Sequence, residues 1–200
     1  QVPRAEFDQM LFNTAKARGA AMVENTRVTA VDFGAKGERA TVTAKPQGGA
    51  MQTWRPRYVL DASGRDTFLA NRLTKKTINK YTNTAAVYAH YKGVERRPGE
   101  FSGYITIHLA EDGWFWMIPL PDGLMSVGFV GNQAVWKDRS GSVRDVLEQK
   151  IAGSPTVSAR MVNAERVSDI YADANYSYRA HQGWGEKHLM IGDSFGFVDP

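Results

Sequence analysis

The chain has no cysteine among its 200 residues, so disulfide bridges and thiolate metal sites are excluded. No stretch reaches the roughly 20 apolar residues of a membrane-spanning helix, and no charged-then-apolar leader opens the sequence. These absences predict a globular protein located in the cytoplasm. The glycine pattern Gly-x-Gly-x-x-Gly, which cradles a pyrophosphate, follows no predicted strand.

Strong charge of one sign is also missing. The 25 basic and 21 acidic residues give a net charge of +4 and are spread along the chain, which disfavours nucleic-acid binding. Four histidines (His90, His108, His181 and His188) show no metal-ligand spacing, so no metal site is predicted.

What the chain does contain is 42% apolar residues, enough for a core of one domain or slightly more. Apolar residues recur with helical period over residues 3–18, and Gly19 ends this predicted helix. Short alternating stretches predict strands at residues 20–24, 27–33, 39–44, 51–54 and 57–60.

The strand at 57–60 runs into Asp61-Ala62-Ser63-Gly64-Arg65 and then a predicted helix at 67–73. Open α/β sheets place ligands in the crevice outside the carboxyl ends of their strands, so this turn is a candidate binding site. A second short strand ends in Gly192-Asp193 and is expected to pass into a helix. Both patterns are also ordinary turn chemistry.

Between these turns the pattern changes to an antiparallel sheet, with strands predicted at 81–92, 101–109, 113–120 and 124–131. A Pro-Asp-Gly turn joins the last two strands. A helix over 142–152 with Ser142 as its cap lies near the sheet, and 164–178 is extended. Because side chains alternate, Trp114 and Trp116 share one face while Phe115 and Met117 share the other. Core packing alone would explain two such indoles.

The run from Trp114 to Pro119 has a further interpretation, because Trp-x-Trp-x-Ile-Pro resembles the signature of flavin-dependent halogenases. That resemblance implies that Trp114, Trp116, Ile118 and Pro119 line a tunnel which keeps substrate away from the flavin.

Other segments resemble the same hydroxybenzoate-hydroxylase-like FAD fold. The resemblance implies cofactor contacts by the Asp61 to Gly64 turn near the pyrophosphate and by Gly192 and Asp193 at the ribityl hydroxyls. The helix beginning Arg4-Ala5-Glu6-Phe7-Asp8 is similar to one that places its arginine near the flavin, and the backbone of Val28 is expected near adenine. Phe197-Val198-Asp199-Pro200 resembles the start of a segment beside the isoalloxazine.

The implied fold is α/β with an added antiparallel sheet. Residues 1–78 and 181–200 would be parts of a glutathione-reductase-like FAD-binding domain, and residues 79–180 would form the substrate domain. Because the glycine-rich cradle is absent, the chain is expected to be an internal part of a family member and to be inactive alone. The family's catalytic lysine would precede this chain, so no lysine here receives that role.

The implied reaction is chlorination or bromination of an aromatic or other electron-rich substrate, small or carrier-bound, by hypohalous acid from a flavin hydroperoxide. It would use FAD, supplied reduced by a separate flavin reductase, and a halide ion. Two alternatives stay open. One is a flavin monooxygenase or geranylgeranyl-reductase-like oxidoreductase of the same fold, and the other is a non-enzymatic binding module.

Overall fold

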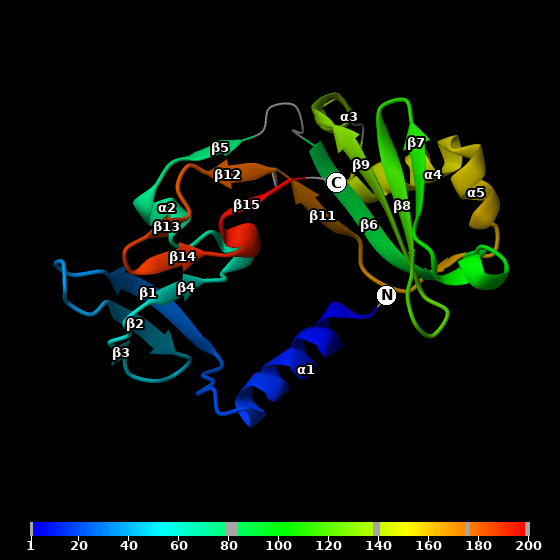
Figure 1. Ribbon diagram of the computed structural model, residues 1–200. Coiled ribbons are helices and arrows are strands. Elements are labelled where there is room, and N and C mark those ends of the chain that lie inside the picture. The colour runs from blue at the N-terminus through cyan, green and yellow to red at the C-terminus, as the bar shows by residue number, and fades with distance from the viewer. Residues whose placement is uncertain (1, 79–83, 138–140, 175–176, 199–200) are drawn as a thin grey trace. The chain divides into compact units, whose positions relative to one another are not determined.

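The computed structural model describes residues 2–78, 84–137, 141–174 and 177–198, and it divides the chain into two compact units (Figure 1). Unit 1 comprises residues 1–8, 79–177 and 199–200, and unit 2 comprises residues 9–78 and 178–198. The main segment of unit 1, residues 79–177, is therefore inserted into the sequence of unit 2. Among the described residues, no helix is long and apolar enough to cross a membrane.

The helix α1 (Arg4–Ala17) opens the chain as predicted, but it buries none of its residues. Its apolar side chains Phe7, Met10 and Leu11 are between 40% and 52% exposed. Residues 20–24, predicted as a strand, have no regular structure. Asn25 follows with a left-handed φ of 50°, which turns the chain into the first true strand.

Unit 1 is built on a six-stranded sheet in the order β10-β6-β9-β8-β7, with β11 also pairing with β6. All of its pairs are antiparallel, which confirms the sheet expected from the alternating pattern. The strands are β6 (Thr84–Lys92), β7 (Thr106–Ala110), β8 (Gly113–Pro119), β9 (Met125–Asn132), β10 (Glu165–Arg166) and β11 (Tyr171–Ala174). The helices are η3 (Gly99–Gly103), α3 (Gln133–Lys137), α4 (Val143–Gly153) and α5 (Pro155–Arg160).

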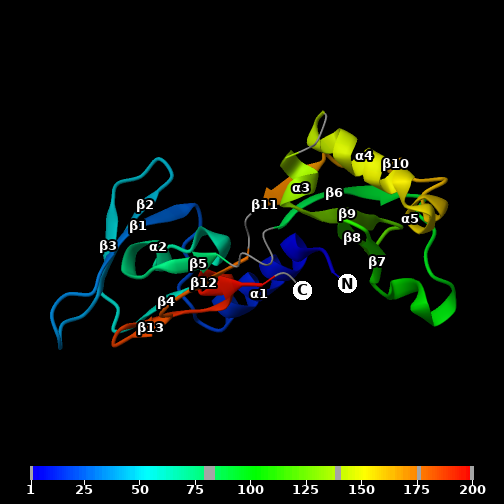
Figure 2. The same cartoon turned by 90° about the horizontal axis from the view of Figure 1, so that it is seen from above.

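Helices α4 and α5 lie on one face of this sheet (Figure 2). Leu147 of α4 and Val157 of α5 are fully buried against Phe115, Met117 and Phe129 from the strands. The sequence predicts α4 because Ser142 caps it, and the structure contains the full capping box with Asp145. The predicted Pro-Asp-Gly turn forms with positive φ at both Asp122 and Gly123, as a tight hairpin requires.

Unit 2 contains three three-stranded sheets: β1-β2-β3, β15-β12-β5 and β13-β14-β4. Its strands are β1 (Thr26–Asp32), β2 (Thr41–Pro46), β3 (Gln52–Trp54), β4 (Val59–Asp61), β5 (Lys76–Ile78), β12 (Tyr178–Ala180), β13 (Trp184–Gly185), β14 (His188–Met190) and β15 (Gly196–Phe197). Its short helices are η1 (Gly64–Asp66), α2 (Ala70–Leu73) and η4 (Gly192–Ser194). A small core around Leu69, Ala180 and Met190 holds them together. The extended segment expected over 164–178 is divided among β10, β11 and the start of β12.

His108 of β7 points toward the helix-covered face and has a buried Nε2 atom without a hydrogen-bond partner among the described residues. Burial lowers the pKa of His108, and the positive charges of Arg160 and Arg97 lower it further. The folded chain therefore resists protonation at this position.

Acidification is expected to destabilise the fold through His108. Between about pH 7.5 and about pH 5.5 the unfolded chain takes up a proton that the folded chain refuses, so stability falls as the pH falls through the unfolded value. Urea unfolding across this pH range should show a smaller loss of unfolding free energy in His108→Gln than in the wild type. Leu109→Gln, at a neighbouring side chain that is 87% exposed, is the control and should keep the wild-type slope. An unchanged slope in His108→Gln would contradict this account.

Candidate functional site

The two indoles lie on the face of the unit 1 sheet opposite to α4 and α5. Trp114 and Trp116 are half-buried on β8, while Phe115 and Met117 between and after them are buried in the core. The indole rings are in contact, with centroids 6.0 Å apart and planes inclined by 55°. Ile118 on the same strand is half-buried and Pro119 is buried. The predicted alternation across β8 is confirmed.

The Asp61 turn is organised by its own aspartate. The carboxylate of Asp61 accepts hydrogen bonds from the backbone N–H of Ser63 (2.9 Å) and of Leu69 (2.7 Å). Asp61 is only 6% exposed, so both bonds compensate for the burial of its charge. Gly64 has φ of +61°, which glycine adopts without strain, and nothing lies within 4 Å of where its Cβ would be. The carboxylate therefore holds the turn rather than facing a ligand.

The Gly192–Asp193 turn is arranged differently. Its short helix η4 puts Asp193 in a half-buried position, with the backbone carbonyl accepting a 2.6 Å hydrogen bond from the Tyr178 hydroxyl. Within the part of the chain that the structure describes, the carboxylate of Asp193 makes no hydrogen bond or ion pair. A free carboxylate is a pure acceptor, suited to binding several hydroxyl groups.

Parallel pairing brings the two turns together. Strands β4 and β14 run parallel with Met190 opposite Asp61, so their carboxyl ends meet at one edge. The carbonyl oxygen of Asp61 accepts hydrogen bonds from the Ile191 N–H (2.9 Å) and from the Ser194 hydroxyl (2.6 Å). Two motifs whose contacting residues Asp61 and Ser194 are 133 residues apart in sequence thus form one structural unit.

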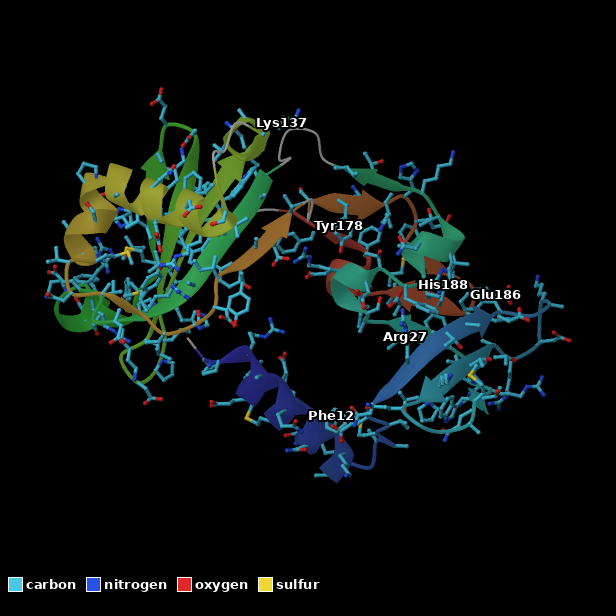
Figure 3. All side chains as sticks on the ribbon, turned by 180° about the vertical axis from the view of Figure 1, so that it is seen from behind. Phe12, Arg27, Lys137, Tyr178, Glu186 and His188 are labelled. Carbon is cyan, nitrogen blue, oxygen red and sulfur yellow. The ribbon has the colours of Figure 1, made fainter. Side chains whose placement is uncertain are left out.

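A groove of about 1380 Å³ opens beside the Asp61 turn. It is bordered by Arg27 and Val28 from β1, and by Asp61, Ser63 and Arg72 from the turn and α2. Figure 3 labels Arg27 on β1, together with Tyr178 and His188 elsewhere in unit 2. The β1–β2 register shifts between Val28 and Ala30, which marks a bulge at the groove wall. The structure therefore brings Val28 and Asp61, both predicted from sequence, to one concave surface.

Of the other predicted residues in unit 2, Gly64, Gly192 and Asp193 do not line this groove. Arg4 is exposed and pairs with Asp8 one helical turn later (3.1 Å), a surface ion pair that contributes little stability. Pro200 lies outside the described residues, so its predicted contact is not located.

Aromatic titratable side chains surround the two turns. Burial lowers the pKa of His188, and the Asp61 carboxylate partly offsets that effect. The His188 ring lies 4.9 Å from that of Phe33, measured between centroids. Burial also raises the pKa of Tyr178, and the nearby charge of Asp193 raises it further. Tyr178 therefore stays protonated and can keep donating to Asp193 at neutral pH.

Sequence reasoning missed Ser194 and Thr67, which brace the site. Both side chains are completely buried. Thr67 adopts a left-handed φ of 47°, a strained conformation for a β-branched residue, and its hydroxyl accepts a hydrogen bond from the Lys76 ammonium group (2.8 Å). The Asp-Ser pair at 193–194 is a helix-start signal, but the sequence does not reveal that its hydroxyl reaches Asp61.

Comparison with known proteins places these features in a family context. The sequence model of the tryptophan halogenase family matches residues 1–200. A tryptophan 2-halogenase from Chondromyces crocatus is 29% identical over the whole chain, which covers 39% of that protein. A 1H-pyrrole-2-carbonyl-[peptidyl-carrier protein] brominase from Pseudoalteromonas luteoviolacea is 31% identical, and the chain covers 50% of it. The chain thus spans about half the length, or less, of these relatives.

Solved structures agree with the sequence matches. The myxobacterial chondrochloren halogenase CndH, described as a variant of FAD-dependent halogenases, superposes with a TM-score of 0.93 at 30% identity. The match covers all of this chain and 47% of that one. A flavoprotein/dehydrogenase from Cytophaga hutchinsonii superposes with a TM-score of 0.88 at 25% identity, over all of this chain and 49% of its own. The expected mixed α/β fold is therefore confirmed.

Removing the Ser194 hydroxyl is expected to destabilise unit 2. Ser194→Ala leaves the buried Asp61 carbonyl with one donor fewer, which should cost about 1–3 kcal/mol of unfolding free energy. Ser102→Ala, at an exposed serine of η3, is the matched control and should change stability by less than about 0.5 kcal/mol. Denaturant unfolding measures both, and equal stabilities would contradict the bracing role of Ser194.

Proposed function

The chain belongs to the tryptophan halogenase family, and from that premise we propose that it is part of an FAD-dependent oxidoreductase which halogenates an electron-rich substrate. One observation carries the proposal most directly. The Asp61 and Gly192–Asp193 turns meet at the carboxyl ends of two parallel strands, where open α/β sheets bind their ligands.

The residues at this edge fit a flavin nucleotide. Asp193 presents a carboxylate with no partner in the described residues, and Gly192 leaves open space beside it. We infer that Asp193 accepts hydrogen bonds from the ribityl hydroxyls. Asp61 acts through the turn: its carboxylate holds the backbone of Ser63 and Leu69 so that the Asp61 to Gly64 turn can approach the pyrophosphate.

The remaining cofactor contacts are proposed from the family resemblance. The backbone of Val28 would approach adenine from the wall of the groove, and Arg4 and Pro200 would lie near the flavin ring. The groove beside Val28 and Asp61 supports the first of these contacts. When bound, the flavin supplies the oxidising chemistry, and the protein contributes position and the exclusion of water.

We assign the paired indoles a separating role. Trp114, Trp116 and Ile118 would line the passage that leads from flavin to substrate and keep the substrate off the flavin. No bond-making step is assigned to them. Pro119, also predicted there, is buried on the opposite face with Phe115 and Met117, so we propose no contact with the passage for it. Residues 1–78 and 181–200 would then serve FAD binding, and residues 79–180 would serve the substrate.

We propose an aromatic substrate from the names of two relatives. One relative is named for tryptophan and another for a pyrrole group on a peptidyl carrier protein. Both are electron-rich aromatic rings, one free and one carrier-bound. A small-molecule or carrier-bound aromatic substrate, a halide ion, a separate flavin reductase and a cytoplasmic location stay predictions from the sequence.

The principal alternative is a flavin monooxygenase or a geranylgeranyl-reductase-like enzyme of the same fold. The structural similarity to a flavoprotein/dehydrogenase, which is not named as a halogenase, favours this alternative. Incubation of the whole protein with reduced FAD, oxygen, bromide and an indole or pyrrole substrate separates the two. A brominated product supports the halogenase, and a hydroxylated product at the same position supports the monooxygenase.

Asp193→Asn tests the cofactor assignment in the whole protein. Loss of one charged acceptor should weaken FAD binding by roughly 10- to 100-fold, because hydrogen bonds to charged groups contribute about 1.5–3 kcal/mol. Flavin fluorescence titration measures the dissociation constant. Asp122→Asn, in the exposed β8–β9 turn, is the matched control and should bind FAD as the wild type does. Equal affinity in the Asp193 variant would remove Asp193 from the cofactor site.

The 200-residue chain alone should bind FAD poorly, because it lacks the glycine-rich cradle for the pyrophosphate. Titration of the purified chain should show little flavin quenching. Tight stoichiometric binding would show that the cradle is not needed.

A further inference from the structure

One row of residues crosses five strands of the unit 1 sheet. In register across β11, β6, β9, β8 and β7, the row reads Tyr171, Tyr88, Gly128, Trp116 and Ile107. Residues directly opposite one another on neighbouring strands point to the same side of a sheet. The row therefore lies on the face that carries Trp114, and Gly128 at its centre contributes no side chain.

The Trp116 indole fills the space above Gly128. A Cβ atom at Gly128 would lie 2.2 Å from Cζ2 and 2.4 Å from Cε2 of Trp116. The three atoms nearest to that Cβ all belong to the Trp116 side chain, so the indole lies directly across the β9 backbone. Any larger residue at 128 must move the indole, because real Cβ atoms do not approach a ring this closely.

Crossing β9 brings Trp116 into contact with the next strand. Its ring centroid is 5.6 Å from that of Tyr88, and the Tyr88 centroid is 5.3 Å from that of Tyr171. Together with the 6.0 Å separation of the Trp114 and Trp116 centroids, these contacts form a continuous aromatic chain from Trp114 through Trp116 and Tyr88 to Tyr171. Each separation lies within the range of favourable ring pairs.

A hydrogen bond fixes the orientation of the indole. Its Nε1–H donates to the hydroxyl of Ser126 at 3.1 Å, and Ser126 is only 9% exposed. Ser126 lies two residues before Gly128 on β9, opposite Ile118. Gly128 thus provides the space for the indole, and Ser126 determines which way its polar edge points.

We propose that Gly128 and Ser126 are positioning residues that hold the Trp116 indole across β9. In this way they set the geometry of the Trp114–Trp116 pair and its continuation to Tyr88. The consequence for catalysis rests on the proposed function: a displaced indole would open the wall between flavin and substrate. Oxygen would then reoxidise the reduced flavin and leave as hydrogen peroxide, without halogenation of the substrate.

The indole N–H of Trp116 reports its own position. In the whole protein labelled with ¹⁵N-tryptophan, the peak lost in Trp116→Phe identifies Trp116. We expect Gly128→Ala to shift this peak. We expect Ser126→Ala to shift it and to accelerate exchange of the N–H with solvent by roughly 2- to 10-fold, the equivalent of one hydrogen bond. Ser126→Thr keeps the hydroxyl and should restore slow exchange.

Gly153→Ala is the matched control, because nothing lies within 4 Å of a Cβ at Gly153. The peak of Trp136, whose Nε1–H donates to the Gly131 carbonyl (3.0 Å), reports whether unit 1 remains folded. An unmoved Trp116 peak in both Gly128→Ala and Ser126→Ala overturns the proposal, as does an equal shift in Gly153→Ala. If Gly128→Ala also displaces the Trp136 peak, that variant has disturbed the fold of unit 1. The result for Ser126→Ala then decides whether the proposal stands.

A second measurement addresses catalysis. Halogenated product formed per reduced FAD consumed should fall several-fold in Gly128→Ala and Ser126→Ala and stay unchanged in Gly153→Ala. If the peaks move as expected but the wild-type protein halogenates nothing, the positioning stands and the proposed function fails. If the wild type halogenates and the ratio is unchanged in both variants, the catalytic consequence is overturned.

Discussion

The backbone carbonyl of Asp61 connects two turns that the chain makes far apart. It accepts hydrogen bonds from the Ile191 N–H and from the buried Ser194 hydroxyl, and it does so because β4 and β14 run parallel. Each turn also has its own internal support. The Asp61 carboxylate closes the first turn, and the Ser194 hydroxyl accepts a bond from the Ile191 N–H in the second (3.0 Å). Among the described residues, the Asp193 carboxylate of the second turn has no hydrogen-bond or ion-pair partner.

Strand alternation gives the unit 1 sheet one buried face and one partly exposed face. On one face Phe115, Met117 and Phe129 are buried beneath Leu147 and Val157 of the helices, and burial of this apolar area stabilises the unit. On the other face the indoles are only half-buried, so their rings remain available for contact. The same strand β8 supplies both faces, which ties the position of the indoles to the rigidity of the core.

Much of the architecture could be predicted from local pattern. The alternation of β8 and β9, the Pro-Asp-Gly turn and the Ser142 cap are encoded by adjacent residues, and all three form as expected. Residues 20–24 alternate equally well but have no regular structure, because a strand needs a pairing partner and none is paired there.

The candidate site was only partly predictable for the same reason. Asp61 and Gly192–Asp193 stand out because strand ends with aspartate and glycine have a recognisable chemistry. The engagement of the Asp61 carboxylate with Leu69, the strained Thr67 and the reach of Ser194 depend on tertiary contacts that no local pattern contains. Gly128 is likewise an ordinary strand glycine until the register places Trp116 above it.

The insertion of unit 1 between the two segments of unit 2 affects the order in which the chain can fold. The strand pairs of unit 1 close between residues 84 and 174, mostly over short separations, so they can form while the chain is still being synthesised. Strands β4 and β5 must wait for β14 and β12, which arrive more than a hundred residues later. During that interval the apolar side chains of β4 lack the neighbouring strand β14, which leaves this segment open to aggregation in the nascent chain.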